Sequence, residues 1–403
     1  MPISEMENLL ITWSLSPYTG WGLYGIQLAQ ALITSDVAQP LLCRAAERSV
    51  YCDFMWLQWL DQIEKKSLPL IKAVADQSQS LPVGVNCKVV IEAIGNRVYP
   101  QEFQGEHRVG VAFFECSRLD SIFRQKLEDF ELVVTGSRWN QRVMERSGFA
   151  RSVLVHQGID TSCFNPIPLP RLLKSPFVLF AGGKLEARKG QDVVVEAFKR
   201  FLPHCPDAML IACWANVDEH SLKTIQLSPF IKSNPISGKG KDLHSWLITE
   251  GIPRRNLLVP SFMPNSKLSP LIKQADAAVF ASRCEGGTNL MAMEALACGL
   301  PTVLSANTGH QDLLGIGLDH AIGVGMDGTG RVQKAITDCY GGDPDGDWGE
   351  TDPDALVDIW CEHLDNLDVW RERGQAGGER MLSWSWKTSM DNLLEILKQR
   401  KLL

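Results

Sequence analysis

Two carboxylates and a pair of glycines lie close together in residues 283–302, which read RCEGGTNLMAMEALACGLPT. Glu285 precedes Gly286 and Gly287, and Glu294 follows within an apolar run of helical character. Glycines let backbone amides approach a ligand, and a helix N-terminus carries roughly half a positive charge that attracts a phosphate. Carboxylates do not suit a phosphate, so both are expected to accept hydrogen bonds from hydroxyl groups. A nucleotide sugar, which is anionic in the middle and hydroxylated at both ends, has the matching chemistry.

The helix that carries Glu294 must begin just after the glycines for this site to form. Thr288 is expected to cap its first turn, and Gly299 and Pro301 are expected to stop it. The helix N-terminus would then face the ligand.

A second loop with phosphate-binding character lies in residues 177–198, which read FVLFAGGKLEARKGQDVVVEAF. The pattern predicts a strand, a glycine turn that includes Gly183, and a helix. Lys184, Arg188 and Lys189 lie between the glycines and the helix. A solvated loop would also carry lysines, but strand–Gly–Gly–Lys followed by Arg–Lys–Gly favours phosphate binding.

The chain begins with a similar arrangement of strand, glycine-rich loop and helix. Residues 9–13 predict a strand, residues 14–25 a loop, and residues 26–33 a helix, which is typical of a doubly wound sheet. Gly20 and Gly22, with a third glycine at position 25, form G-x-G-x-x-G. Two interpretations are open: the glycines fit the turn, or Gly20 or Gly22 lets the backbone face a phosphate across a cleft.

Glu115 follows a buried strand in residues 109–114, at the end where the strands of such a sheet meet a ligand. It is either a site residue or the partner of Arg118 in a loop ion pair. In the later loop at residues 260–264, Phe262 or Met263 is expected either against a nucleobase or in the core.

A chain of 403 residues exceeds what one hydrophobic core usually serves, so two domains are expected. Prolines at positions 166, 168 and 170 cannot continue a helix or a central strand, and they predict the linker between the domains. We predict a first domain at residues 1–168, a second at residues 169–385, and a C-terminal helix at residues 386–403.

Composition and charge exclude several classes of protein. The net charge of −7 argues against nucleic-acid binding, which requires a basic face. No apolar run reaches the roughly 20 residues of a spanning helix, and the N-terminus is unlike a signal peptide, so a cytoplasmic protein is expected. The aromatic stretch FMWLQWL at residues 54–60 predicts core packing or a surface for a lipid-like acceptor, with peripheral contact at the inner face of the membrane as the second possibility.

An acidic stretch in residues 340–353 contains aspartates at alternate positions from Asp343 to Asp347. A calcium loop would need glycine where Trp348 stands, so a solvated loop is the preferred interpretation. Asp343–Pro344–Asp345 also fits the short D-x-D pattern of metal-dependent sugar transferases. The pattern is too short to outweigh the rest of the sequence, and no metal site is expected.

Three stretches together resemble the GT-B glycosyltransferases, specifically the retaining family called glycosyl transferases group 1, or GT4. These stretches are residues 133–160, FAGGKLEARKG at 180–190, and ADAAVFASRCEGGTNLMAMEALACGLPTV at 275–303. The resemblance implies two Rossmann-like domains that face a central crevice. It places the donor mainly in the C-terminal domain and the acceptor in the N-terminal one. It also implies a last helix that crosses back to the first domain.

The resemblance also implies roles for individual residues. Lys184 and Lys189 match the two basic positions of the family's G-R-L-x-x-x-K-G pattern, which bind the diphosphate of the donor. Glu285 matches the acidic residue that contacts the transferred sugar, and Glu294 the one that binds the ribose. The family separates these acidic residues by seven positions, whereas eight separate Glu285 from Glu294 here. The donor loop and helix start complete the set: Gly286, Gly287, Thr288, Asn289 and Leu290.

The function implied is transfer of a sugar from a nucleotide diphosphate sugar to an acceptor hydroxyl, with retention and without a metal or other cofactor. Lys184 and Lys189 would stabilise the charge that grows on the leaving diphosphate, and Glu115 would orient the acceptor. The acceptor is a glycan, a glycolipid or other lipid-linked molecule, a protein or a small molecule. A nucleotide-sugar epimerase of the same fold and a non-catalytic sugar-nucleotide-binding protein are the alternatives.

Overall fold

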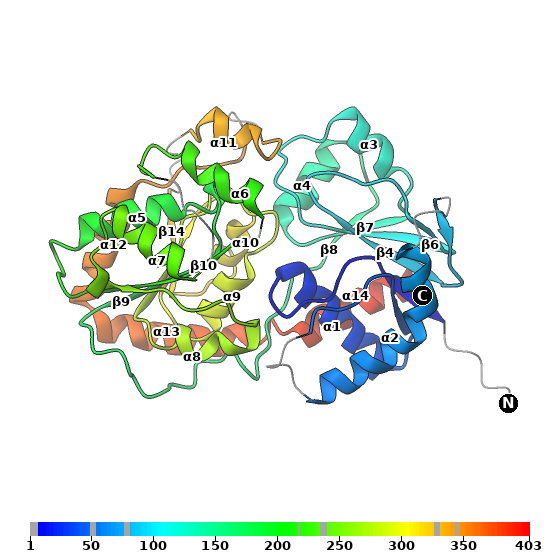
Figure 1. The fold of residues 1–403 in the computed structure, drawn as a ribbon, viewed down its shortest axis with the longest axis horizontal. Helices are drawn as coiled ribbons and strands as arrows, with labels where there is room; N and C mark the ends of the chain where they lie inside the picture. Colours follow the sequence, from blue (N-terminus) through cyan, green and yellow to red (C-terminus); the bar gives the residue numbers. More distant parts are fainter. Residues whose placement is uncertain are drawn as a thin grey trace.

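The computed structural model describes residues 7–48, 54–75, 81–216, 218–233, 240–325, 331–342 and 346–403. The chain forms two lobes, each built around a six-stranded parallel sheet (Figure 1). The strands are short and mostly buried on both faces, as expected where helices cover a parallel sheet.

The first sheet has the strand order β2-β1-β4-β6-β7-β8. A two-stranded ribbon of β3 (Val83–Gly84) and β5 (Phe103–Gln104) accompanies it. The six strands of the sheet are β1 (Asn8–Ile11), β2 (Gln39–Leu42), β4 (Val89–Ile94), β6 (His107–Ala112), β7 (Leu132–Thr135) and β8 (Ser152–Leu154).

The second sheet has the strand order β11-β10-β9-β12-β13-β14, in which the chain reverses direction across the sheet between β9 and β12. Ligands bind at such a switch point, outside the carboxyl ends of the strands. Its strands are β9 (Val178–Lys184), β10 (Met209–Ala215), β11 (Leu257–Leu258), β12 (Ala277–Phe280), β13 (Thr302–Ser305) and β14 (Ala321–Val324).

Helices flank both sheets. Those of the first lobe are α1 (Gly20–Ser35), α2 (Phe54–Ala75), α3 (Ser121–Leu127) and α4 (Arg138–Arg146). Those that follow are α5 (Gln191–Phe201), α6 (Glu219–Lys223), α7 (Gly240–Thr249), α8 (Ser269–Ile272), α9 (Leu290–Ala297), α10 (His310–Leu314), α11 (Lys334–Asp338), α12 (Pro353–Asp365), α13 (Leu367–Met381) and α14 (Trp386–Gln399). Short 3-10 turns occupy Ala187–Lys189, Thr224–Leu227, Arg254–Asn256 and Asn265–Lys267.

The last helix, α14, returns to the first lobe and packs beside α1 (Figure 1). Its apolar side chains, which include Trp386 and Leu393, are buried in the same core cluster as Tyr24 and Leu28 of α1. The C-terminal helix therefore belongs to the hydrophobic core of the first lobe.

The chain crosses between the lobes twice, and the two crossings lie side by side. Ile159 N donates to Trp384 O at 2.9 Å, and Trp386 N donates to Ile159 O at 3.0 Å. Gly158 is required at this place, because a Cβ there would overlap the backbone of Trp386. Residues 155–177 otherwise contain no helix or strand.

The aromatic stretch at residues 54–60 lies on α2. Trp56 is 8% exposed and Leu60 is 1% exposed, and both pack into the core of the first lobe. This favours the core-packing interpretation for these two residues. Within the described residues, no helix combines the length and the apolar character that a membrane crossing requires.

Candidate functional site

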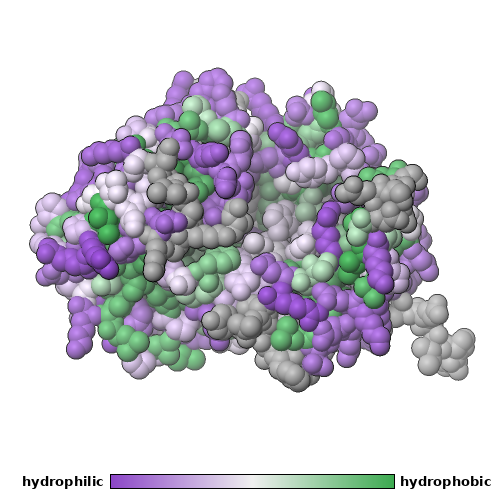
Figure 2. Space-filling model, in the orientation of Figure 1, coloured by the Kyte–Doolittle hydropathy of each residue, from purple (hydrophilic) through white to green (hydrophobic). Residues whose placement is uncertain are grey.

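A cavity of about 540 Å³ opens between the two lobes, where Figure 2 shows a recess in the surface. The ends of β1, β6, β9 and β12 all lead into loops that line it, as expected at the carboxyl ends of parallel strands. Most of the residues predicted for the site line this cavity. They are Gly20, Glu115, Gly183, Lys184, Lys189, Phe262, Met263, Glu285, Gly286, Gly287, Asn289 and Leu290.

Glu285 is the most heavily paired carboxylate of the cavity. Lys189 Nζ lies 2.7 Å from both of its oxygens, and Arg188 Nη1 lies 3.3 Å from Oε2. Ser282 Oγ and Asn289 Nδ2 also donate to Oε1, at 2.6 and 3.0 Å. Burial acts to raise the pKa of Glu285, but the nearby cations outweigh burial and lower the pKa to about 2. Glu285 is therefore an ionised hydrogen-bond acceptor at neutral pH.

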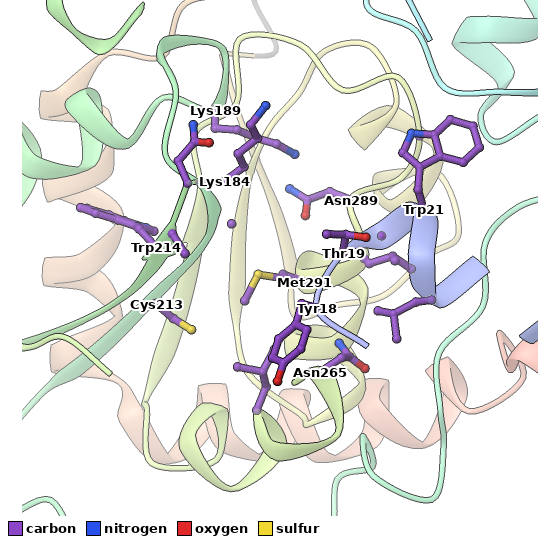
Figure 3. A pocket seen from close by; sticks show the side chains of 18 of the residues that line it. Tyr18, Thr19, Trp21, Lys184, Lys189, Cys213, Trp214, Asn265, Asn289 and Met291 are labelled. Carbon is purple, nitrogen blue, oxygen red and sulfur yellow. The ribbon is translucent and has the colours of Figure 1, made fainter. Parts of the chain in front are cut away.

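Lys184 stands at the end of β9 and is the more exposed of the two predicted lysines, with 42% of its side chain accessible. Its Nζ donates to Ser221 Oγ at 2.8 Å and lies 3.4 Å from Glu186 and 3.6 Å from Asp218. In Figure 3 Lys184 and Lys189 lie at the same end of the cavity. The two lysines thus bring positive charge to one end of the site.

Arg188 is a further cation of the site. The family resemblance implies a role for Lys184 and Lys189 but none for Arg188. It lines the cavity and is 7% exposed. Its guanidinium donates to Glu186 at 2.6 Å and to the Cys284 carbonyl at 2.7 Å, and Nη1 lies 3.6 Å from Glu115. Its Nε has no hydrogen-bond partner among the described residues. The Arg–Lys–Gly sequence before α5 was the available signal, since it predicts a cationic group here.

Glu294 lies on α9 and is 3% exposed. Its Oε1 accepts a hydrogen bond from Asn265 Nδ2 at 2.6 Å, and its Oε2 has no partner in the described part of the chain. Burial raises the pKa of Glu294 to about 8. Glu294 is not among the described lining residues, whereas Asn265 is, so the carboxyl lies one side chain away from the cavity.

The start of α9 differs from the predicted one. Asn289, and not Thr288, caps the helix: its side chain accepts from Ala292 N, and its backbone has a φ of 65°. Thr288 is fully buried, and its Oγ1 lies 2.9 Å from the sulfur of Met293. Asn tolerates positive φ better than most residues, which suits it to this turn.

His310 contacts the side chain of Asn289. It is fully buried, and its Nε2 lies 3.2 Å from Asn289 Nδ2, while Nδ1 lies 3.2 Å from the Ser305 carbonyl. Because an amide N–H donates to Nε2, the proton of the ring is assigned to Nδ1. Burial lowers the pKa of His310 to about 4, so the ring is neutral at physiological pH.

The predicted glycine loop at residues 14–25 was wrong in part, because α1 begins at Gly20 with Thr19 as its cap. Gly20 lines the cavity, and a Cβ there would lie 3.5 Å from Leu290. Gly22 does not line the cavity, and a Cβ there would overlap the carbonyl oxygen of Ser16. Close packing against the preceding loop, rather than approach to a phosphate, therefore explains Gly22.

The two lobes touch where the loop before α1 meets residues 260–265. The rings of Tyr18 and Phe262 stack with centroids 4.9 Å apart and 18° between their planes. Asn265 N donates to the Pro17 carbonyl at 2.8 Å. Phe262 and Met263 line the cavity, and the prediction that one of them contacts a nucleobase stays a prediction.

The acidic stretch after α11 is described only in part, and Asp343, Pro344 and Asp345 lie outside the described residues. Asp347 accepts from Trp139 Nε1 at 2.7 Å and from Arg146 at 2.8 Å, which places it in contacts with α4. Among the residues that the structure describes, no cluster of three or more His, Cys, Asp or Glu side chains is arranged to hold a metal ion.

Comparison with known proteins gives a family match for part of the chain. Residues 169–321 match the family model of Glycosyl transferases group 1, and a comparison with curated sequences gave no match. Among solved structures, the chain is similar to sucrose-phosphate synthase from Thermosynechococcus elongatus, with 14% identity, a TM-score of 0.65, and 98% of this chain and 99% of the other covered. It is also similar to HepE of Anabaena in complex with UDP and glucose, at 13% identity, a TM-score of 0.62, and 98% and 100% coverage.

A glycosyltransferase from Rickettsia africae gives the same picture, with 14% identity, a TM-score of 0.62, and 98% of both chains covered. These likenesses confirm the predicted fold class of two parallel α/β domains in the GT-B arrangement. The chain therefore has the GT-B fold, and residues 169–321 of its second lobe match the model of Glycosyl transferases group 1.

Proposed function

We propose that the protein is a retaining glycosyltransferase that moves a sugar from a nucleotide diphosphate sugar to an acceptor hydroxyl. The observation that carries the proposal is the contact of Lys189 and Arg188 with Glu285 just before the N-terminus of α9, inside an interdomain cavity. A group of cations beside an ionised carboxylate and a helix N-terminus suits a ligand with an anionic part and a hydroxylated part.

The donor is proposed to be a UDP-sugar in the first instance. One similar structure, HepE of Anabaena, is described as a complex with UDP and glucose, and another structure of the same protein as a complex with UDP-glucose. These neighbours are 13% identical to the chain, so their likeness supports the fold and not the ligand. UDP is therefore the first nucleotide to test.

The charged groups suggest how the donor would be held. An arriving diphosphate would compete with Glu285 for Lys189, because the ammonium group can pair with either anion. Glu285 would then have an oxygen available to accept a hydroxyl of the transferred sugar. The buried carboxyl of Glu294 has an oxygen, Oε2, with no partner among the described residues, and this carboxyl would hydrogen-bond a hydroxyl of the ribose if Asn265 moved aside.

The same residues would act in the transition state. Negative charge grows on the diphosphate as the glycosidic bond breaks, and Lys184, Lys189 and the backbone amides at the start of α9 would stabilise it. Removal of one preorganised donor of this kind costs roughly 100 to 1000-fold in rate. Glu115 is proposed to orient the acceptor hydroxyl, and retention is proposed on the strength of the family resemblance. No cofactor or metal ion is included in the proposal.

The proposal is tested by titration calorimetry with UDP in buffer that contains EDTA, followed by NMR of UDP-glucose with and without candidate acceptors. We expect UDP to bind in the micromolar to millimolar range, and transfer to an acceptor to give a product with the anomeric configuration of the donor. Epimerisation of the donor without an acceptor would contradict sugar transfer. Inversion at the anomeric carbon would contradict retention alone.

A further inference from the structure

The charged residues of the cavity are divided unevenly between the domains. The second domain contributes three cations, Lys184, Arg188 and Lys189, and two carboxylates, Asp218 and Glu285, to the described lining. The first domain contributes no lysine, arginine or histidine to the described lining, and its one charged lining residue is Glu115. An anion that enters the cavity is therefore attracted to the second domain and away from the first-domain wall.

Two aromatic rings form an angled apolar surface on the first-domain wall, with the two ring planes nearly perpendicular. Trp21 and Phe113 both line the cavity, and their rings meet edge to face with centroids 4.9 Å apart. Trp13 packs against Trp21 at 5.5 Å, and its Nε1 donates to the Trp21 carbonyl at 2.8 Å. The Trp21 ring thus contacts both Trp13 and Phe113, and the hydrogen bond anchors its backbone. In Figure 3 Trp21 lies on the side of the cavity opposite Lys184.

The aromatic surface reaches the loop that is predicted to hold the donor sugar. A Cβ on Gly287 would lie 2.9 Å from Phe113 Cδ1, so the backbone of that loop packs directly on the Phe113 ring. A molecule placed against Trp21 and Phe113 would consequently lie beside the sugar end of the proposed donor and away from its diphosphate.

Glu115 supplies the polar group beside this surface. Its backbone N donates to Asn96 Oδ1 at 2.6 Å, and its carbonyl accepts from Trp348 Nε1 at 2.9 Å, which fixes its position. Its side chain is 18% exposed and lines the cavity. A carboxylate held in this way can accept a hydrogen bond from a hydroxyl group.

We propose that the acceptor held at the first-domain wall is an uncharged sugar ring. The apolar face of the ring packs against Trp21 and Phe113, and one of its hydroxyl groups donates to Glu115. A phosphorylated sugar is disfavoured, because the described lining of this wall contains no cation and Glu115 repels the phosphate. Arg188 lies 3.6 Å from Glu115 but is already paired with Glu115, Glu186 and Glu285. This inference rests on the proposed function.

The test compares neutral methyl glycosides of glucose, galactose and mannose with their 6-phosphates. Each is titrated into protein saturated with UDP and followed by saturation-transfer NMR. We expect at least one neutral glycoside to bind roughly tenfold more tightly than its 6-phosphate, which corresponds to about 1.4 kcal/mol. Equal or tighter binding of every 6-phosphate overturns the proposal, and so does the failure of all three neutral glycosides to bind.

Variants locate the subsite. Trp21→Ala is expected to weaken glycoside binding about tenfold while UDP affinity is unchanged, and Trp21→Phe is expected to retain most of the binding. Tyr99→Ala removes a ring that is 67% exposed and outside the described lining, so it serves as the matched control. Unchanged glycoside binding in Trp21→Ala overturns the proposal. Glu115→Lys should shift the preference toward the 6-phosphate, since it puts a cation on the wall.

The UDP titration separates this inference from the proposed function. A wild-type protein that does not bind UDP contradicts the proposed function. A wild-type protein that binds UDP but prefers the phosphorylated sugars contradicts the acceptor subsite alone.

Discussion

The carboxylate of Glu115 in the first domain lies 3.6 Å from the guanidinium of Arg188 in the second. The same guanidinium lies 3.3 Å from Glu285 and 2.6 Å from Glu186. One buried cation therefore lies among three carboxylates, two on the donor side of the cavity and one on the opposite wall. Lys189 also pairs with Glu285, and Lys184 lies near Glu186, so removal of Arg188 would leave the three buried carboxylates with less compensation.

Arg188→Met is expected to lower the free energy of unfolding by roughly 3 kcal/mol at pH 7.5, because loss of one partner from a buried charge cluster leaves the others desolvated. The loss should shrink as the pH falls, since the orphaned carboxylates then take up protons. Urea unfolding at pH 5 and pH 7.5 measures both effects. Arg188→Lys keeps the charge and should lose less, and equal losses in the two variants would contradict the electrostatic explanation.

Lys189→Ala is expected to weaken UDP binding roughly 10 to 100-fold, since a charge-assisted hydrogen bond contributes about 1.5–3 kcal/mol. Calorimetry on the purified variant measures the change. Lys199→Ala is the matched control, because Lys199 lies on α5 in an ion pair with Glu196 at 2.7 Å and outside the cavity lining. An unchanged affinity of Lys189→Ala for UDP would contradict the assignment of a phosphate site at this loop.

Glu294 should make folding stability fall as the pH rises. The carboxyl titrates at its ordinary value of 4.5 in the unfolded chain and at about 8 in the folded one, so the folded state retains a proton between these values. The contribution of Glu294 to folding stability is therefore highest below pH 4.5. It decreases between pH 4.5 and about pH 8 and is constant at higher pH.

Glu294→Gln keeps an oxygen for Asn265 and removes the titration, so its unfolding midpoint should not show this decrease. The comparison uses thermal unfolding of both proteins from pH 5 to pH 9, because the other titrating groups are common to both. Parallel curves for the two proteins would show that Glu294 retains an ordinary pKa when buried.

Much of the site could be predicted from residue type and spacing alone. Strand–Gly–Gly–Lys and Glu–Gly–Gly are local patterns, and parallel strands bring their carboxyl ends to one edge, so Lys189 and Glu285 could be assigned to one cavity. Arg188 was harder to assign, because its role depends on Glu115, which lies 73 positions away in the chain and comes into contact only in the fold.

Two predictions from the sequence were wrong: the cap of α9 and the extent of the first glycine loop. Local backbone geometry explains both. Thr288 and Asn289 are both good helix caps, and the choice between them depends on a φ of 65° that the packing around His310 and Glu285 stabilises. Glycine is found both in loops and in the first turn of helices, so residue type alone did not show that Gly20 and Gly22 belong to α1. The overlap that a Cβ at Gly22 would have with Ser16 is a tertiary contact and leaves no signal in the local sequence.

Gly22→Ala is accordingly expected to destabilise the first domain by roughly 1–3 kcal/mol through overpacking against Ser16. Gly20→Ala, whose new Cβ would lie at an ordinary 3.5 Å from Leu290, is expected to stay within about 0.5 kcal/mol of the wild type. Chemical unfolding of the two variants in parallel measures the difference. If Gly22→Ala folds normally and instead loses UDP affinity, the glycine contributes to the ligand site after all.

The paired crossings at Ile159 and Trp386 restrict how the two lobes can move. Two separate linkers would allow the domains to twist and slide independently, but backbone hydrogen bonds join these two segments into a miniature ladder. A rotation of one lobe against the other would bend both crossings at this point, so we expect the two segments to move together as one connection.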